Sequence, residues 1–209
     1  MKLDQLSVRD FIHELSSVKA APGGGSVAAL CGALGAALSA MVSRLTKGRE
    51  KFKDMWKTME EIQQKADDLA GLFLNLVQKD TDTYQQVMAA IKQPRETDED
   101  KTSRQAAIEE SMKKATAVPL EILRASEKLI KIAEKVVECG NPVALSDAGG
   151  ALQLARTSGA IAAYNVRINL ARIEDEKFVA EHRREVDETL ERMETLFSKV
   201  DGYMNAHLS

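Results

Sequence analysis

The chain has 209 residues and a formal net charge of -3, from 29 Lys and Arg against 32 Asp and Glu. This length suits one domain with a single hydrophobic core, residues 1–209, because two smaller domains would each bury too little surface to be stable alone. Acidic and basic residues are mixed throughout, so the chain creates no long-range field that would recruit a polyanion, and we expect no nucleic-acid partner.

The two cysteines, Cys31 and Cys139, lie far apart in the sequence and show no CxxC or Cys–His spacing. We therefore expect two reduced, buried thiols in a cytoplasmic protein, with no disulfide and no metal site. The first residues carry acids before any long apolar run, which is not the plan of a signal peptide. A run of small apolar residues at 27–42 is shorter than the ~20 residues that a bilayer requires, so we expect no membrane insertion.

The first two predicted helices are separated by a glycine-rich break. Ser7, followed three residues later by Asp10, resembles a capping box and starts a short helix that ends near residue 18. Pro22 and the glycines at 23–25 interrupt the chain, and Ser26 or a neighbouring glycine caps a second helix that reaches residue 45 or 46. This second helix is rich in Ala and Gly and must pack close to a neighbouring backbone, either inside one subunit or across a twofold dimer axis.

Two long helices are predicted next. Apolar residues recur at helical spacing from Phe52 to Ile91, which predicts a rod of roughly 60 Å. Pro94 and the acidic residues around it indicate a solvated connection. The second long helix is predicted from about residue 101 to residue 139, with a kink or a break at Pro119.

Two further helices complete the prediction. Gly140 and Pro142 end the preceding helix. Ser146 and Asp147 open a helix that reaches about residue 173, and a last helix covers roughly 175–206. No segment shows the alternation of β-branched and polar residues that is typical of a strand. The sequence therefore predicts an all-α bundle of about six helices.

One carboxylate falls on the apolar stripe of the first long helix. Asp80 lies four residues after Leu76 and four before Tyr84, so helical geometry points the three side chains in the same direction. A carboxylate in that position is either buried with a partner or faces a cavity; the alternative is that the helix emerges into solvent there. Asp82 points away from the stripe and is expected at the surface.

Polar residues also gather in the helix predicted after Gly140. An aspartate at a helix start, such as Asp147, is stabilised by unpaired N–H groups and by the helix dipole, so an ordinary cap is a sufficient explanation for it. Asn165 and Asn169 lie one turn apart beside apolar residues. Two amides at that spacing either hold one ligand or form hydrogen bonds between helices.

The glycine run at 23–25 does not match a phosphate-binding loop. Such a loop follows a strand and closes with Lys-Ser/Thr, whereas here Gly-Gly-Gly-Ser follows a helix and precedes Val-Ala-Ala. Consecutive glycines instead let the backbone pass close to another group, and the helix start behind them offers N–H donors. A tight turn between helices is the simpler alternative.

Five segments together resemble the formiminotransferase-cyclodeaminase C-terminal domain family, in that family's order and spacing and over essentially the whole chain. They are PGGGSVAALCGALGAALSAMVSRLT at 22–46, KDTDTY at 79–84, VPLEI at 118–122, GNPVALSDAG at 140–149 and NVRINLARIEDEKF at 165–178. The resemblance implies an all-helical homodimer that acts on tetrahydrofolate one-carbon adducts. Some members of that family convert 5-formiminotetrahydrofolate to 5,10-methenyltetrahydrofolate and ammonia, and others are stand-alone methenyltetrahydrofolate cyclohydrolases.

The resemblance also implies a folate site. Its implied acid–base residues are Asp80 and Asp147. The residues implied to bind the substrate are Gly23, Gly24, Gly25, Ser26, Arg95, Asn141, Ser146, Asn165 and Asn169. Arg95 stands where many members carry a lysine after Leu-Pro; its positive charge suits a substrate carboxylate, but an arginine does not replace a lysine that transfers a proton.

Both family activities act on the carbon that bridges N5 and N10 of the folate. One site that holds these two nitrogen atoms and supplies an acid–base group can therefore serve either reaction. We expect cyclodeaminase activity, with cyclohydrolase activity as the alternative; Asp80 or Asp147 transfers the proton, and Asn165 and Asn169 orient the pterin. No metal or tightly bound cofactor is expected. A non-catalytic helical dimer, or a folate-binding module, is the second alternative.

Overall fold

The structure is a computed structural model and describes residues 2–208. It contains six α-helices and three short 3₁₀ helices, with no strand within these residues. In chain order the elements are η1 (Leu3–Gln5), α1 (Val8–Leu15), α2 (Gly24–Lys47), η2 (Glu50–Met55), α3 (Trp56–Ile91), α4 (Asp98–Cys139), η3 (Pro142–Ala144), α5 (Leu145–Leu170) and α6 (Glu176–His207). The predicted all-α bundle is confirmed.

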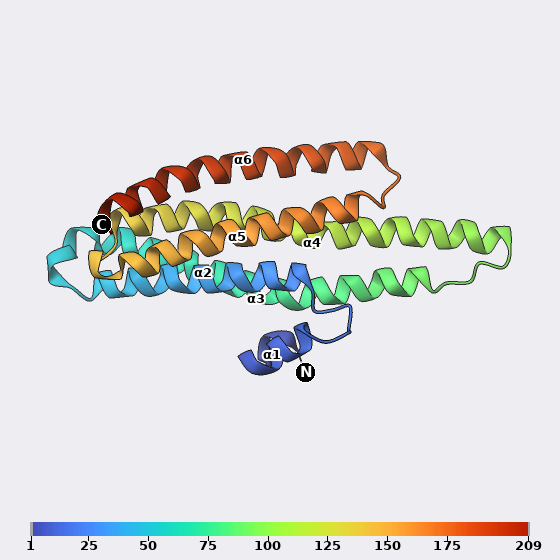
Figure 1. Ribbon diagram of the computed structural model, residues 1–209, viewed down its shortest axis with the longest axis horizontal. Helices are drawn as coiled ribbons and strands as arrows, with labels where there is room; N and C mark the ends of the chain where they lie inside the picture. Colours follow the sequence, from blue (N-terminus) through green and yellow to red (C-terminus); the bar gives the residue numbers. More distant parts are fainter. Residues whose placement is uncertain (1, 209) are drawn as a thin grey trace.

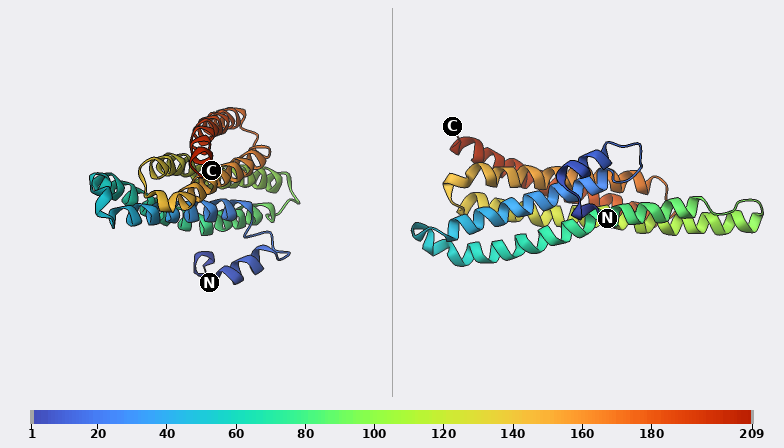
Figure 2. Two further views of the ribbon diagram at one scale, coloured as in Figure 1. Left: turned by 60° about the vertical axis from the view of Figure 1, so that its left-hand side comes forward. Right: turned by 90° about the horizontal axis from the view of Figure 1, so that it is seen from below.

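Four long helices form the centre of the bundle (Figure 1). α2 packs against α3 and α5, α4 packs against the same two helices, and each of these pairs runs antiparallel. α6 covers α4 and α5 on one side, whereas α1 stands off on the opposite side. α3 and α4 continue together past the ends of the other helices, as the right-hand view of Figure 2 shows. The N-terminal end of α2 therefore lies beside the middle of α3 and α4.

Small residues in α2 allow α3 and α5 to approach closely. A Cβ atom added to Gly32 would overlap the ring of Phe73 on α3, which is fully buried. A Cβ atom on Gly35 would lie 3.1 Å from Cβ of Leu154 on α5. The close packing that the Ala/Gly composition predicts is thus present inside a single chain.

α4 runs through Pro119 without interruption, so the expected break does not occur. A proline lacks the N–H that would bond the carbonyl oxygen four residues earlier. That oxygen belongs to Ala115, and it accepts a hydrogen bond of 3.1 Å from Nδ2 of Asn169 on α5. The neighbouring helix supplies the donor that α4 lacks.

Some helix ends differ from the prediction. Ser7 caps α1 as expected, because its Oγ accepts the Asp10 N–H at 3.1 Å. Ser146 and Asp147 are not caps: α5 begins at Leu145, so both residues fall within its first turn. Asn141 provides the local cap instead, for η3, by accepting the Val143 N–H at 3.2 Å. Residues 50–55 form η2 rather than the start of the long rod.

Among residues 2–208, only α2 is long and apolar enough to cross a membrane by length and composition. In the structure 61% of its most apolar window is buried inside the bundle, as in the core helix of a globular protein. Cys31 on this helix is a free thiol, and so is Cys139. Both are half-buried rather than fully buried.

Candidate active site

A cavity of about 250 Å³ opens at the N-terminal end of α2, where α3, α4 and α5 pass beside it. Several residues implied by the family resemblance line this cavity: Gly23, Gly24, Gly25, Asp80, Asn165 and Asn169. Its apolar lining comes from Tyr84, Val87, Met112, Ala115 and Ile168. The cavity therefore combines a few polar groups with apolar walls, the usual composition of a small-molecule site.

Asp80 of α3 lies directly against the first turn of α2. A Cβ atom added to Gly25 would overlap the Asp80 carboxylate, so only glycine leaves room for this contact. Oγ of Ser26 lies 3.1 Å from Oδ2 of Asp80 and 3.0 Å from the carbonyl oxygen of Val77. Gly23, the N-cap residue of α2, has no side chain, and the Asp80 carboxylate of the neighbouring helix lies beside this first turn.

The surroundings of Asp80 make its carboxyl group a weaker acid than that of an exposed aspartate. Burial raises the pKa of the Asp80 carboxyl above its ordinary value, and hydrogen bonding with Ser26 opposes this shift in part. None of the ion pairs formed within residues 2–208 includes Asp80. A half-buried carboxylate with a raised pKa and no ion-pair partner is suited to exchanging a proton with a ligand.

Asn165 and Asn169 project from α5 towards the same cavity. A Cβ atom on Gly24 would lie 3.2 Å from Nδ2 of Asn165, so the first turn of α2 touches this amide on one side and Asp80 on the other. Nδ2 of Asn165 donates to the Ile161 carbonyl at 2.8 Å, while Nδ2 of Asn169 donates to Ala115. These bonds fix both amides and orient their Oδ1 atoms as acceptors for a ligand.

The remaining residues of the implied site lie elsewhere in the chain. Asn141 is buried at the opposite end of the bundle, where its N–H donates at 2.8 Å to Oγ1 of Thr46, near the C-terminal end of α2. Ser146 and Asp147 stand in the next turns of the chain. Asp147 and Asn165 are 18 residues apart on α5 (165 − 147), or about 27 Å along the helix. Within one chain the structure does not bring these residues to the cavity.

Arg95 is also remote from the cavity. It lies in the connection after α3, at the tip of the overhang formed by α3 and α4, and its side chain is exposed. From Asp80 to the last residue of α3, Ile91, the helix rises by about 17 Å. The structure therefore does not place Arg95 among the residues that line the cavity.

One cationic residue of the cavity, Arg172, is not among those predicted from the sequence. Arg172 lines its rim, just after the end of α5. The spacing of Asn165, Asn169 and Arg172 is that of one helical face, so a signal was present in the sequence. Thr83 of α3 completes the polar lining.

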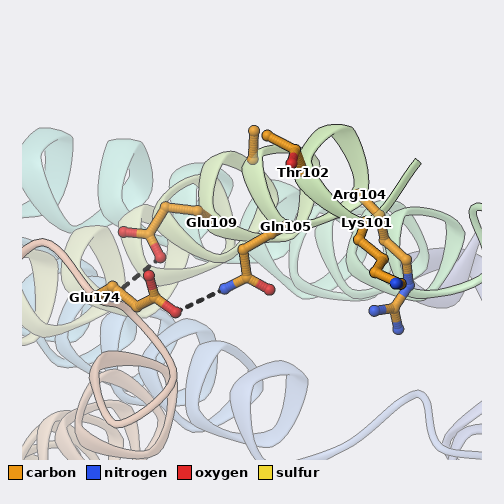
Figure 3. Close-up of a pocket in the computed structure, with 7 residues that line it drawn as sticks. Lys101, Thr102, Arg104, Gln105, Glu109 and Glu174 are labelled. Atoms are coloured by element: carbon orange, nitrogen blue, oxygen red, sulfur yellow. Dashed lines mark hydrogen bonds between the residues drawn. The ribbon is translucent and has the colours of Figure 1, made fainter. Parts of the chain in front are cut away.

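A wider hollow of about 650 Å³ lies on α4 and the turn before α6 (Figure 3). Three of its polar residues bond one another: Nε2 of Gln105 donates to Glu174 at 2.8 Å, and Glu109 accepts the N–H of Glu174 at 3.0 Å. Ala106 is the one apolar residue among the described residues that line this hollow. Across residues 2–208, no group of three or more His, Cys, Asp or Glu side chains is arranged to hold a metal ion.

Comparisons with known proteins identify relatives of the chain as a whole. A methenyltetrahydrofolate cyclohydrolase from Methylorubrum extorquens is 36% identical over 203 residues, covering 93% of this chain and 98% of that protein. The formimidoyltransferase-cyclodeaminase of Rattus norvegicus is 34% identical over 200 residues, which cover 96% of this chain but only 37% of the rat protein. The crystal structure of formiminotetrahydrofolate cyclodeaminase from Thermotoga maritima matches with a TM-score of 0.90 and 26% identity over 100% of both chains.

A family model described as formiminotransferase-cyclodeaminase matches residues 7–188, which is most of the chain. The matched region includes α2, α3, α4 and α5, the four helices around the cavity. The chain therefore belongs to the formiminotransferase-cyclodeaminase family.

Proposed function

We propose that this protein closes a ring between N5 and N10 of a tetrahydrofolate adduct, converting 5-formiminotetrahydrofolate to 5,10-methenyltetrahydrofolate and ammonia. The observation that carries the proposal is Asp80, a carboxylate of raised pKa that faces a cavity beside a helix N-terminus. The full-length likeness to a Thermotoga maritima protein named for this substrate and reaction supports it.

The reaction needs one group that first takes a proton and then returns it. N10 attacks the amidinium carbon on N5 and loses its proton, and the bond from that carbon to the amino nitrogen breaks as this nitrogen gains a proton and leaves as ammonia. In this proposal the Asp80 carboxylate takes the proton from N10 and gives it to the leaving nitrogen. Its negative charge also stabilises the cationic amidinium and the methenyl product. Asn165 and Asn169 orient the pterin through their Oδ1 atoms.

The second candidate is hydrolysis of 5,10-methenyltetrahydrofolate to the 10-formyl form. It is favoured by the relative from Methylorubrum extorquens, which is named methenyltetrahydrofolate cyclohydrolase. Water adds to the same bridging carbon, so the intermediate carries a hydroxyl group where that of the first reaction carries an amino group. The same carboxylate and the same amides serve both reactions.

An absorbance assay of methenyltetrahydrofolate tests both candidates in parallel, by its formation from the formimino substrate and by its loss through hydrolysis. We expect Asp80→Asn to lower kcat by roughly 10²–10⁴-fold with the fold retained, as judged by circular dichroism. Asp82→Asn is the matched control, because Asp82 is exposed, is not among the residues that line the cavity and accepts a hydrogen bond from Gln78. If the protein binds no reduced folate, the proposed function is wrong and a non-catalytic helical dimer takes its place.

We further propose that two copies pair through the outer face of α2. No charged residue occurs between Lys19 and Arg44, so the outer face of α2 forms an apolar stripe. Leu34 in this stripe is 50% exposed to solvent, and Leu45, just beyond it, is 48% exposed. The accessible surface of 11576 Å² also exceeds the roughly 9600 Å² expected of a compact monomer of 22.9 kDa. Burying the apolar stripe against a second copy removes it from water.

Such a pairing has a consequence for Asp147. Leu34 lies near the middle of α2, and a twofold axis that crosses α2 there at a right angle makes the two α2 helices antiparallel. The N-terminal end of α2, with the cavity, then lies beside the partner's C-terminal end, where Thr46 and Asn141 hold the turn before Asp147. In this proposal the second copy brings Asp147 to the cavity. Light scattering tests the pairing: Leu34→Lys should convert a dimer into a monomer.

A further inference from the structure

The lining of the cavity contains one anionic side chain, Asp80, and one cationic side chain, Arg172. They stand on different helical elements, Asp80 on α3 and Arg172 in the turn after α5. A folate adduct has the same division of charge: a cationic carbon at the pterin end during the reaction, and a carboxylate on the glutamate at the other end.

The backbone around Arg172 is held in place, while its guanidinium is available. Its N–H donates to the Asn169 carbonyl at 3.0 Å, and the Ala171 N–H donates to the Arg167 carbonyl at 3.2 Å, so the helical path continues beyond Leu170. The side chain is exposed and takes part in no ion pair within the described chain. Arg167, five residues earlier, differs in this respect, because it is paired with Asp187 at 2.7 Å.

The spacing along α5 matches the shape of the ligand. Asn165, which touches the first turn of α2, and Arg172 are seven residues apart (172 − 165), or about 10 Å along a helical path. Apolar groups of Val87, Met112 and Ile168 lie in the same lining. In a folate, a flat benzoyl ring and one amide bond separate N10 from the glutamate, so the ring suits the apolar wall and the carboxylate reaches Arg172.

The volume of the cavity also indicates that the glutamate lies at the rim. At about 250 Å³ it is smaller than the ~300–1,000 Å³ typical of sites that enclose a drug-sized ligand. The pterin end and the ring fill it, and the glutamate leaves through the rim on which Arg172 stands. A guanidinium at a rim can bind a carboxylate through two parallel hydrogen bonds and remain partly hydrated.

We propose that Arg172 binds the carboxylate of the substrate's first glutamate and thereby selects folates over pterins that lack it. The proposal rests on the proposed function, since it takes a tetrahydrofolate adduct as the ligand. In this proposal Arg172, and not Arg95 as the family resemblance implies, binds the carboxylate of the substrate.

The test compares two ligands on three variants. Calorimetric titration measures the Kd of 5-formyltetrahydrofolate and of the methylamide of 5-formyltetrahydropteroate, which has neither the glutamate nor a free carboxylate, for wild type, Arg172→Gln and Arg95→Gln. Arg183→Gln, an exposed arginine of α6 outside the cavity, is the matched control. We expect Arg172→Gln to weaken binding of the folate by about 10–100-fold and to leave binding of the pteroate methylamide unchanged, because a charge-assisted hydrogen bond is lost.

Turnover provides a second readout. Arg172→Gln should raise KM for the glutamate-containing substrate while kcat stays near the wild-type value, and Arg172→Lys should recover part of the affinity. Equal weakening of both ligands, no weakening of either, or an effect of Arg95→Gln in place of Arg172→Gln would overturn the proposal. A wild-type protein that binds neither ligand overturns the proposed function instead, so the two failures are distinguishable.

Discussion

Asn169 replaces the hydrogen bond that Pro119 removes from α4. Its Nδ2 atom lies 3.1 Å from the Ala115 carbonyl oxygen, the acceptor left without a backbone donor by the proline. This contact keeps α4 continuous and, at the same time, fixes an amide in the cavity at the N-terminal end of α2. Pro119 inside α4 and Asn169 on the apolar face of α5 are therefore linked through the Ala115 carbonyl oxygen.

The first prediction concerns this pair. Asn169→Ala should lower the free energy of unfolding by about 1–2 kcal/mol, because the Ala115 carbonyl loses its donor. In a Pro119→Ala background the backbone N–H of residue 119 returns, so the same substitution should cost clearly less. Urea unfolding of the four proteins in this double-mutant cycle measures the coupling. Equal costs in both backgrounds would show that the two residues act independently.

The second prediction concerns the pH dependence of stability. Because burial raises the pKa of Asp80 in the folded protein above its value in the unfolded chain, the folded state holds the proton more tightly. The stabilisation from this proton is complete below the ordinary Asp pKa of ~3.9 and is lost as the pH rises through the raised value. Asp80→Asn, which cannot ionise, should therefore gain stability relative to wild type between about pH 3 and pH 7. A difference that is constant or shrinks over this range contradicts the assignment.

The third prediction separates two glycines. Gly25→Ala should displace the Asp80 carboxylate and lower kcat by at least ~10-fold, because the reacting group moves from its position. Gly71→Ala is the control: a Cβ atom there meets nothing within 4 Å, so alanine should stabilise α3 by up to about 1 kcal/mol and leave kcat unchanged. Steady-state kinetics and thermal unfolding of both variants test this. Wild-type kcat in Gly25→Ala would mean that the position of Asp80 is not critical.

The fourth prediction tests whether Asp147 acts from a second copy. If the cavity of one chain is completed by the other, Asp80→Asn and Asp147→Asn are both inactive alone, but their co-expression restores activity. About a quarter of wild-type activity is expected, since half of randomly formed dimers are mixed and each has one intact site. Mixed dimers without activity, or a fully active Asp147→Asn variant, would remove Asp147 from the site.

Much of this arrangement could be predicted from the sequence. Asp80 interrupts an apolar stripe of helical period, and that pattern alone predicts a carboxylate facing inwards or into a cavity. The length of the helix between Asp147 and Asn165 was equally visible, and it already excludes a single pocket containing both residues of one chain. The order of the family motifs along the sequence does not indicate how far apart Asp147 and Asn165 lie in space.

Other features depend on which helices are neighbours. The bond from Asn169 to Ala115 requires the relative register of α4 and α5, which no local pattern contains. The position of Arg95 depends on how far α3 and α4 extend beyond the bundle. Arg172 shares a helical face with Asn165, but its place at the cavity depends on how α5 packs against α2 and α4.

Two contacts between α2 and α3 follow one register. Gly32 meets Phe73 and Gly25 meets Asp80, so each contact lies seven residues from the other on both helices (32 − 25 and 80 − 73). The first is a contact between apolar groups in the core, and the second sets the surroundings of an ionisable group. A core substitution at position 32 or 73 that changes the separation of the two helices would therefore alter the proton affinity of Asp80 two helical turns away. The acid strength of this carboxyl group is in that sense a property of the core packing, and it can be adjusted without changing any residue of the cavity.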